Sequence, residues 1–152
     1  EQEIEKIRKS IDGRVGDAPK VLPKTSAPEA CGASFKGHTY LTIALKTNWR
    51  EAAAMCKKMG GHLAYIETAE ELTFITKTFP DLRLWVGATD AHKEGDWRWG
   101  NRKPVSRNLW SKVEPSRLAG ENYALIFNGA DRRLHDVVLN HSGVVGFICE
   151  WE

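Results

Sequence analysis

The side chains with the most reactive chemistry are three cysteines, Cys31, Cys56 and Cys149. Their spacing matches none of the paired-cysteine patterns that hold structural zinc. In an exported chain an odd count leaves one disulfide and one unpaired thiol, whereas in a reducing cytosol all of them would stay free. Cys31 follows a proline-containing segment rather than a basic helix start, so we do not assign it as a catalytic thiol.

The histidines are poorly placed for catalysis. His135 and Asp136 are adjacent, so on a strand their side chains face opposite ways, and no nucleophile elbow or paired-histidine metal motif accompanies them. His62, His92 and His141 are scattered singly, as surface or capping histidines commonly are. The sequence therefore argues against an enzyme.

Bulk composition limits the class of protein further. The 152 residues carry 22 Lys and Arg against 20 Asp and Glu, a net charge of +2 that is too small to indicate binding to nucleic acid or an anionic membrane. No run approaches about 18 apolar residues and the start is not charged-then-apolar, so we expect no membrane insertion and no signal peptide. The length suits one domain plus a tail.

The central element of the predicted fold is the segment from Leu82 to Trp99. Its first part is a near-continuous apolar run ending at Ala88, which is typical of a strand covered on both faces. Turn residues follow, and Trp97-Arg98-Trp99 then alternates, which predicts a hairpin with two indoles on one face. Each indole can bury about 200 Å², so we interpret them as core residues rather than a binding platform.

Two amphipathic helices are predicted, each opened by a capping box in which two residues three positions apart satisfy each other's backbone. The boxes are Asn48 with Glu51 and Thr68 with Glu71. The first helix points Cys56 inward and ends at Gly60-Gly61, and the second stops at Pro80.

Shorter patterned runs predict the remaining strands, at residues 38–45, 62–66, 123–127, 134–138 and 145–151. Residues 1–12 place isoleucines at coiled-coil spacing, and we interpret them as a short helical remnant that is a candidate oligomerisation segment. Residues 13–32 predict a linker, which leaves 33–152 as the domain. The loop from Gly100 to Asn122 has little pattern, and a loop this long usually has a function.

Several motifs occur in a distinctive order: a cysteine-bearing first helix, then GGHLAYI, WVGATD, EGDWRW, a Glu-Pro step in the long loop, and a terminal FICEWE. This order resembles a C-type lectin-like domain over about residues 33 to 152, and GHTYL with the few cysteines resembles the bacterial members. The resemblance implies an α+β fold in which two helices pack on antiparallel sheets and a long loop presents the ligand.

The resemblance also implies a disulfide. In the family a bond joins the first helix to the final strand, and Cys56 and Cys149 occupy those positions here. The family's second bridge falls on Tyr123 and Leu139, so we expect apolar packing to replace it. Cys31 matches the amino-terminal cysteine of longer members, but its partner position holds no cysteine, so we expect it to be unpaired or shared with another chain.

The ligand site implied by the resemblance lies in and beside the long loop. Sugar-binding members hold calcium through a Glu-Pro-Asn or Gln-Pro-Asp triplet, a later glutamate and an Asn-Asp step, and the same groups bind sugar hydroxyls. The matching positions are Glu114, Ser116, Glu121, His135 and Asp136, with Glu114, Glu121 and Asp136 as the candidate calcium ligands. Ser116 reaches less far than asparagine and His135 offers nitrogen, so two of the ligands are weakened.

Arginines offer an alternative to calcium. Arg117, Arg132 and Arg133 are close by in sequence, and a guanidinium can neutralise carboxylates without a metal. We favour this alternative and expect no cofactor, with calcium as the candidate if one is bound. The Glu-Pro-Ser triplet is closer to the mannose-associated type, and Pro115 is a candidate cis residue.

The sequence and the resemblance together predict non-catalytic recognition of carbohydrate by an exported or cell-surface protein. The alternative is a calcium-independent protein–protein interaction module that uses the same loop. The two functions can be distinguished by whether the carboxylates of Glu114, Glu121 and Asp136 bind one ion together.

Overall fold

The computed structural model describes residues 29–79, 83–127 and 132–152. The predicted segment 1–12, most of the predicted linker, Leu82 and the helix stop at Pro80 lie outside the described residues. None of the helices within these ranges is both long enough and apolar enough to cross a bilayer.

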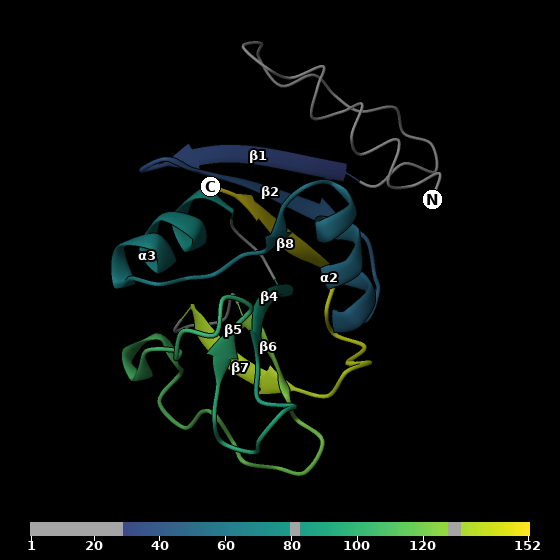
Figure 1. Cartoon of the computed structure of the whole chain (residues 1–152), viewed down its shortest axis with the longest axis vertical. Coiled ribbons are helices and arrows are strands. Elements are labelled where there is room, and N and C mark those ends of the chain that lie inside the picture. The colour runs from purple at the N-terminus through teal and green to yellow at the C-terminus, as the bar shows by residue number, and fades with distance from the viewer. Residues whose placement is uncertain (1–28, 80–82, 128–131) are drawn as a thin grey trace.

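A mixed β-sheet organises the domain, with strand order β1-β2-β8-β4-β6-β7 (Figure 1). Its strands are β1 (Glu29–Phe35), β2 (His38–Ala44), β4 (Arg83–Thr89), β6 (Tyr123–Phe127), β7 (Arg133–Val137) and β8 (Gly146–Trp151). The short strands β3 (His62–Leu63) and β5 (Arg98–Trp99) pair with β8 and β4. Only β4 and β8 pair in parallel among the described strands. The sheet with its two helices confirms the predicted α+β fold.

Strand β1 shows that the domain begins earlier than the sequence predicts. Residues 29–32 fall in the predicted linker, but β1 pairs with β2 along its whole length, from Glu29 opposite Ala44 to Phe35 opposite His38. Ladder hydrogen bonds join backbone groups and need no particular side chain, so a segment of mostly small residues can form an edge strand. The boundary at residue 33 is therefore wrong.

The two long helices are α2 (Trp49–Lys58) and α3 (Ala69–Thr78), and a single 3₁₀ turn, η1, spans Arg107–Leu109. Both capping boxes are present as predicted. The Asn48 side chain accepts from the Glu51 N–H at 2.8 Å, and the Thr68 hydroxyl accepts from the Glu71 N–H at 3.1 Å. Gly60 then ends α2 in the left-handed region, with φ of 85°.

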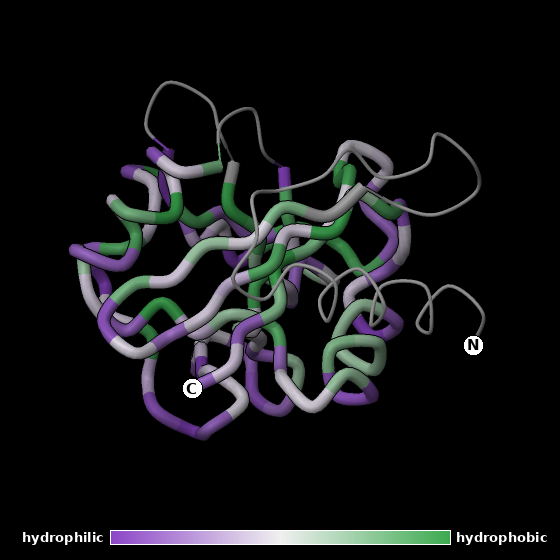
Figure 2. Tube along the Cα trace, turned by 90° about the horizontal axis from the view of Figure 1, so that it is seen from above, coloured by the Kyte–Doolittle hydropathy of each residue, from purple (hydrophilic) through white to green (hydrophobic). Residues whose placement is uncertain are grey.

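The two helices cover different faces of the sheet and lie on either side of β8 (Figure 1). Helix α2 places Ala52 and Cys56 in one cluster of buried residues, and α3 places Leu72 and Ile75 in another. Adjacent residues of a strand point to opposite faces, so each central strand contributes side chains to both clusters. Apolar segments accordingly run along the central strands, while the outer loops are polar (Figure 2).

The predicted disulfide between Cys56 and Cys149 is present, with the two Cα atoms 5.4 Å apart. It joins α2 to β8 across 93 positions, a separation for which loop entropy gives about 4.5 kcal/mol of stabilisation. Cys31 is free and exposed. Tyr123 and Leu139 both pack into the cluster that contains the disulfide. Apolar packing therefore occupies the place of the family's second disulfide.

Tryptophans fill the core, as the sequence predicts. Trp85 is fully buried, and its indole N–H donates to the Thr47 carbonyl at 2.9 Å. Trp97 and Trp99 are 7% and 2% exposed, so neither offers a surface for stacking a ligand.

Replacing Trp85 by alanine should lower the free energy of unfolding by about 3–5 kcal/mol, because the truncation leaves a large cavity and an unsatisfied Thr47 carbonyl. Denaturant unfolding measures the loss. Val113→Ala is the control, since Val113 is 81% exposed and its truncation should change stability by less than about 0.5 kcal/mol. A stable Trp85→Ala variant would contradict the core assignment.

Candidate functional site

The long loop runs along the free edge of β7. Trp110 forms a parallel bridge with Leu134, and the Ser111 N–H donates to the Leu134 carbonyl at 3.0 Å. The Glu114-Pro115 peptide bond that follows is cis, as expected. A loop beside an edge strand can reach side chains on both of its faces, which is why His135 and Asp136 both contact it.

Ser116 connects two of the predicted carboxylates. Its N–H donates to both carboxylate oxygens of Asp136, at 2.9 and 3.0 Å. Its hydroxyl lies 2.5 Å from Glu121 Oε1 and 3.0 Å from Asp136 Oδ2. A hydroxyl has one proton, so it satisfies one carboxylate at a time. Asp136 is only 2% exposed and therefore depends on this residue for its hydrogen bonds.

Glu114 faces His135 instead. Its Oε2 lies 3.2 Å from His135 Nδ1, and the two side chains are 13% and 22% exposed. Burial, followed by the negative charge of Asp136, raises the pKa of Glu114 above its usual range. The carboxylate is thus held in an unfavourable environment that a positive partner would relieve.

The structure brings the predicted site residues together in two groups. Ser116 contacts Glu121 and Asp136, and His135 contacts Glu114. Glu114, Ser116, Glu121, His135 and Asp136 all line one cleft of about 360 Å³. Three acidic or histidine residues with ligand atoms within 4.8 Å of one another would mark a metal centre, and among the described residues these carboxylates do not form such a set.

The predicted arginine partners are not used. The Arg133 guanidinium donates to the Asn108 carbonyl, and in the described ranges neither Arg117 nor Arg132 pairs with a carboxylate. Arg83 lines the cleft instead. Sequence reasoning missed it because Arg83 comes from β4, and only the pairing of β4 with β6 and of β6 with β7 carries it to this edge.

A second acidic pair lies near the cleft and was read from the sequence only as turn residues. Asp90 is 1% exposed, its Oδ2 accepts from the Gly95 N–H at 2.8 Å, and its Oδ1 has no hydrogen-bond partner in the described part of the chain. A hydrogen bond with Asp90, then partial desolvation and the charges of Asp90 and Asp136, raise the pKa of Glu94. The carboxylates of Asp90 and Asp136 thus both act on Glu94.

These residues fit calcium in kind but not in arrangement. Carboxylate and hydroxyl oxygens are the donors that calcium prefers, and the unpartnered Asp90 Oδ1 is an atom that a cation would satisfy. However, Ser116 already engages Glu121 and Asp136, and His135 engages Glu114. Calcium would have to displace these hydrogen bonds before it could gather its ligands.

A basic cleft adjoins this acidic cluster. It has a volume of about 750 Å³ and shares Glu114 and Pro115 with the long loop. Five cationic residues, Lys93, Arg98, Arg107, Lys112 and Arg117, line it together with three acidic ones, Glu94, Asp96 and Glu114, so positive charge is in excess. Arg98 pairs with Asp96 at 2.9 Å, whereas the other four side chains make no ion pair or hydrogen bond with the described residues.

Comparison with known proteins identifies the class. The family described as "Lectin C-type domain" matches residues 45–150, and the chain belongs to this family. It is 32% identical over 135 residues to a perlucin-like protein of Mytilus galloprovincialis, covering 83% of this chain and 86% of that protein. It is 32% identical over 96 residues to human C-type lectin domain family 17, member A, covering 62% of this chain and 25% of that protein.

Solved structures agree on the fold. The mouse scavenger receptor C-type lectin carbohydrate-recognition domain superposes with a TM-score of 0.72 at 26% identity, covering 80% of this chain and 93% of that chain. A calcium-independent type II antifreeze protein superposes with a TM-score of 0.71 at 24% identity, covering 86% of this chain and 94% of that chain.

Membership of this family makes the domain a non-enzymatic binding module. The relatives with named organisms are animal proteins, so the expected likeness to bacterial members gains no support.

Ser116→Ala should destabilise the domain by about 1–3 kcal/mol, because the buried Asp136 loses a hydrogen bond and Glu121 loses its neighbour's hydroxyl. Thermal or denaturant unfolding measures the change. Ser142→Ala, on an exposed turn, is the matched control and should be nearly neutral. Equal stability of both variants would show that the serine bridge is not formed.

Millimolar calcium should raise the melting temperature by less than about 2 °C relative to chelator, because the ion must break existing hydrogen bonds to bind. Differential scanning fluorimetry with and without EDTA measures the shift. A rise of many degrees that Asp136→Asn abolishes would instead establish a calcium site built from the predicted ligands.

Proposed function

We propose that this domain recognises acidic saccharides, using the basic cleft together with the acidic edge of the long loop. The observation that carries the proposal is a set of four cationic side chains around one cleft beside that loop, none of which forms an ion pair within the described ranges. Similar folds include carbohydrate-recognition domains, which supports a saccharide as the ligand.

The chemistry of the cleft favours sulfate or carboxylate groups. Arg107 and Arg117 can each donate two parallel hydrogen bonds to such a group, and Lys93 and Lys112 add compact positive charge. Glu114 forms part of the same wall and can accept from ring hydroxyls. A sugar that carries both an anionic group and free hydroxyls therefore matches both parts of this surface.

Neutral, mannose-like sugars match the surface less well. Their recognition through vicinal hydroxyls relies on a cation held by Glu114, Glu121 and Asp136. Those carboxylates are engaged by Ser116 and His135, so we propose a binding mode with little dependence on calcium.

A calcium-independent protein partner is the second candidate. Two apolar side chains of the long loop, Val113 and Leu118, are 81% and 61% exposed. Exposed aliphatic side chains beside unpaired cations also suit an acidic protein surface. Binding to a protein but to no saccharide would favour this candidate.

We also propose that the domain works outside the cytosol, since a disulfide joins Cys56 to Cys149 and such bonds persist in oxidising compartments. Oligomerisation through residues 1–12 remains a proposal, because that segment lies outside the described residues.

A glycan array probed with calcium and with EDTA tests the ligand class directly. We expect sulfated or carboxylated glycans to bind in both conditions and neutral mannose-type glycans to bind weakly. Raising the salt concentration should weaken binding, because the attraction is electrostatic. Binding restricted to neutral glycans and to the calcium condition would overturn the proposal.

The double variant Lys112→Ala, Arg117→Ala should bind an acidic glycan at least about tenfold more weakly, which corresponds to about 1.4 kcal/mol. The matched control removes the same two charges elsewhere, through Arg50→Ala and Lys57→Ala on α2. Surface plasmon resonance measures both. Equal losses in the two variants would indicate a nonspecific charge effect rather than recognition by the cleft.

A further inference from the structure

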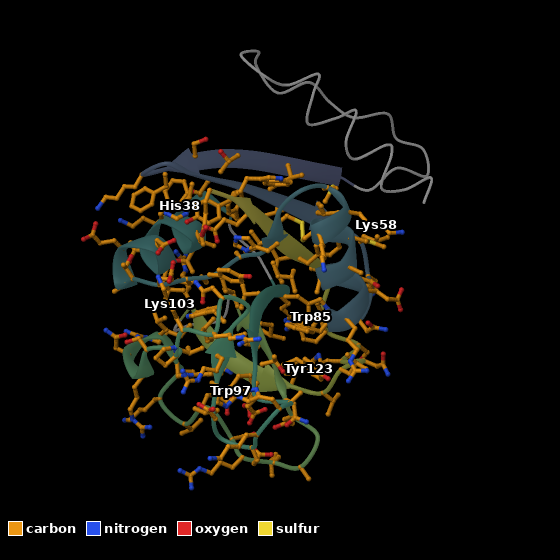
Figure 3. The ribbon with its side chains drawn as sticks, in the orientation of Figure 1. His38, Lys58, Trp85, Trp97, Lys103 and Tyr123 are labelled. Atoms are coloured by element: carbon orange, nitrogen blue, oxygen red, sulfur yellow. A yellow bond between two sulfur atoms is a disulfide. The ribbon has the colours of Figure 1, made fainter. Side chains whose placement is uncertain are left out.

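A cluster of histidine and glutamate side chains lies at the other end of the sheet from the ligand loop. Figure 3 shows His38 in the half of the molecule with β1, β2 and α3, away from Trp97 and Tyr123. One ligand atom from each of His38, Glu150 and Glu152 lies within 4.8 Å of the others. We propose that these residues, with His62, form a binding site for a zinc ion.

The sheet register places three of the side chains on one face. Glu150 of β8 lies opposite Tyr40 of β2 on one side and opposite His62 of β3 on the other. Residues two apart in a strand point the same way, so His38 joins the same face, and Glu152 follows directly after β8. The cluster is thus built by three neighbouring backbones and not by one flexible loop.

His62 has the orientation that a metal ligand needs. Its Nδ1 lies 2.7 Å from the Leu63 carbonyl oxygen, which leaves Nε2 as the ring nitrogen available to a metal. The ring stacks on Tyr65 with centroids 3.8 Å apart. A hydrogen bond from the second ring nitrogen to a carbonyl is the usual support of a metal-binding histidine.

The other ring nitrogen, Nε2, lies beside Glu152, one of the three clustered residues. His62 Nε2 is buried and has no hydrogen-bond partner among the described residues, and it lies 3.7 Å from Glu152 Oε1. Ligand atoms of a tetrahedral zinc site stand about 3.3–3.5 Å apart. This pair is therefore close to the spacing that zinc requires.

The remaining ligands are equally constrained. Glu150 is fully buried, its Oε1 accepts from the Tyr65 N–H at 2.8 Å, and its Oε2 lies 2.5 Å from His38 Nδ1. A bound metal would take the place of the hydrogen bond between Glu150 and His38. Glu152 has a half-exposed side chain and can rotate to close the site.

The donor set selects among metals. Two imidazoles and two carboxylates suit zinc, whereas calcium takes oxygen ligands and would gain little from the histidines. Nearby Glu71 is not available, because its Oε2 accepts from the Tyr40 hydroxyl at 2.7 Å and its Oε1 from the Glu67 N–H at 3.1 Å. A bound zinc ion would join β2, β3 and β8 next to Cys149.

Calorimetric titration of the EDTA-treated protein with zinc chloride tests the site. We expect one zinc per chain, a higher melting temperature with zinc, and no competition from millimolar calcium. Cobalt chloride should give the intense visible absorption of tetrahedral cobalt, which reports the geometry independently. His62→Gln and Glu152→Gln should each weaken zinc binding tenfold or more, because each removes a ligand.

Three variants control for other zinc ligands: Cys31→Ser removes the free thiol, His92→Gln removes the His92–Asp96 pair, and Glu114→Gln alters the loop cluster. Each should bind zinc as the unmodified protein does. Glu152→Gln changes a half-exposed side chain and should stay folded, which keeps the test decisive if His62→Gln is unstable. Unchanged affinity in Glu152→Gln, or a loss in any control, would overturn the proposal.

Discussion

The pairing of β8 is the constraint on which the rest of the domain depends. This strand is bonded to β2, β3 and β4, and its Cys149 holds α2 through the disulfide. Gly146 begins the strand so close to β2 that a Cβ there would lie 2.2 Å from the Ile43 carbonyl. Only glycine allows this approach, so the position of β8 between β2 and β4 is fixed by a backbone contact as well as by apolar packing.

Strands β7 and β8 each bury a carboxylate. Asp136 and Glu150 are 2% and 0% exposed, and each accepts a backbone N–H, from Ser116 and from Tyr65. Each also meets a polar side chain, a serine hydroxyl at one end and the His38 imidazole at the other. A buried charge is tolerated only with such partners. The proposed zinc site uses the second arrangement, in which an imidazole faces the buried carboxylate.

The recognition surface combines opposite charges that do not cancel. The acidic edge at Asp136 and the basic cleft at Arg117 adjoin through the Glu114-Pro115 step, and Asp136 accepts hydrogen bonds from Ser116 while Glu114 faces His135. The indoles lie in the core, so aromatic stacking is not available for binding. The proposed recognition of an acidic saccharide therefore relies on charge, which attracts the ligand, and on hydrogen bonds, which orient it.

The sequence by itself determined what local chemistry controls. The capping residues Asn48 and Thr68 opened both helices where predicted, and the order of motifs identified the family and the cysteine pair. Tertiary structure alone decided the features that depend on pairing between distant backbones. It added β1, whose ladder needs no side-chain pattern, and it set Arg83 rather than a neighbouring arginine in the acidic cleft. Charged residues that are close in sequence need not be close in space, because the register of the sheet determines which side chains are neighbours.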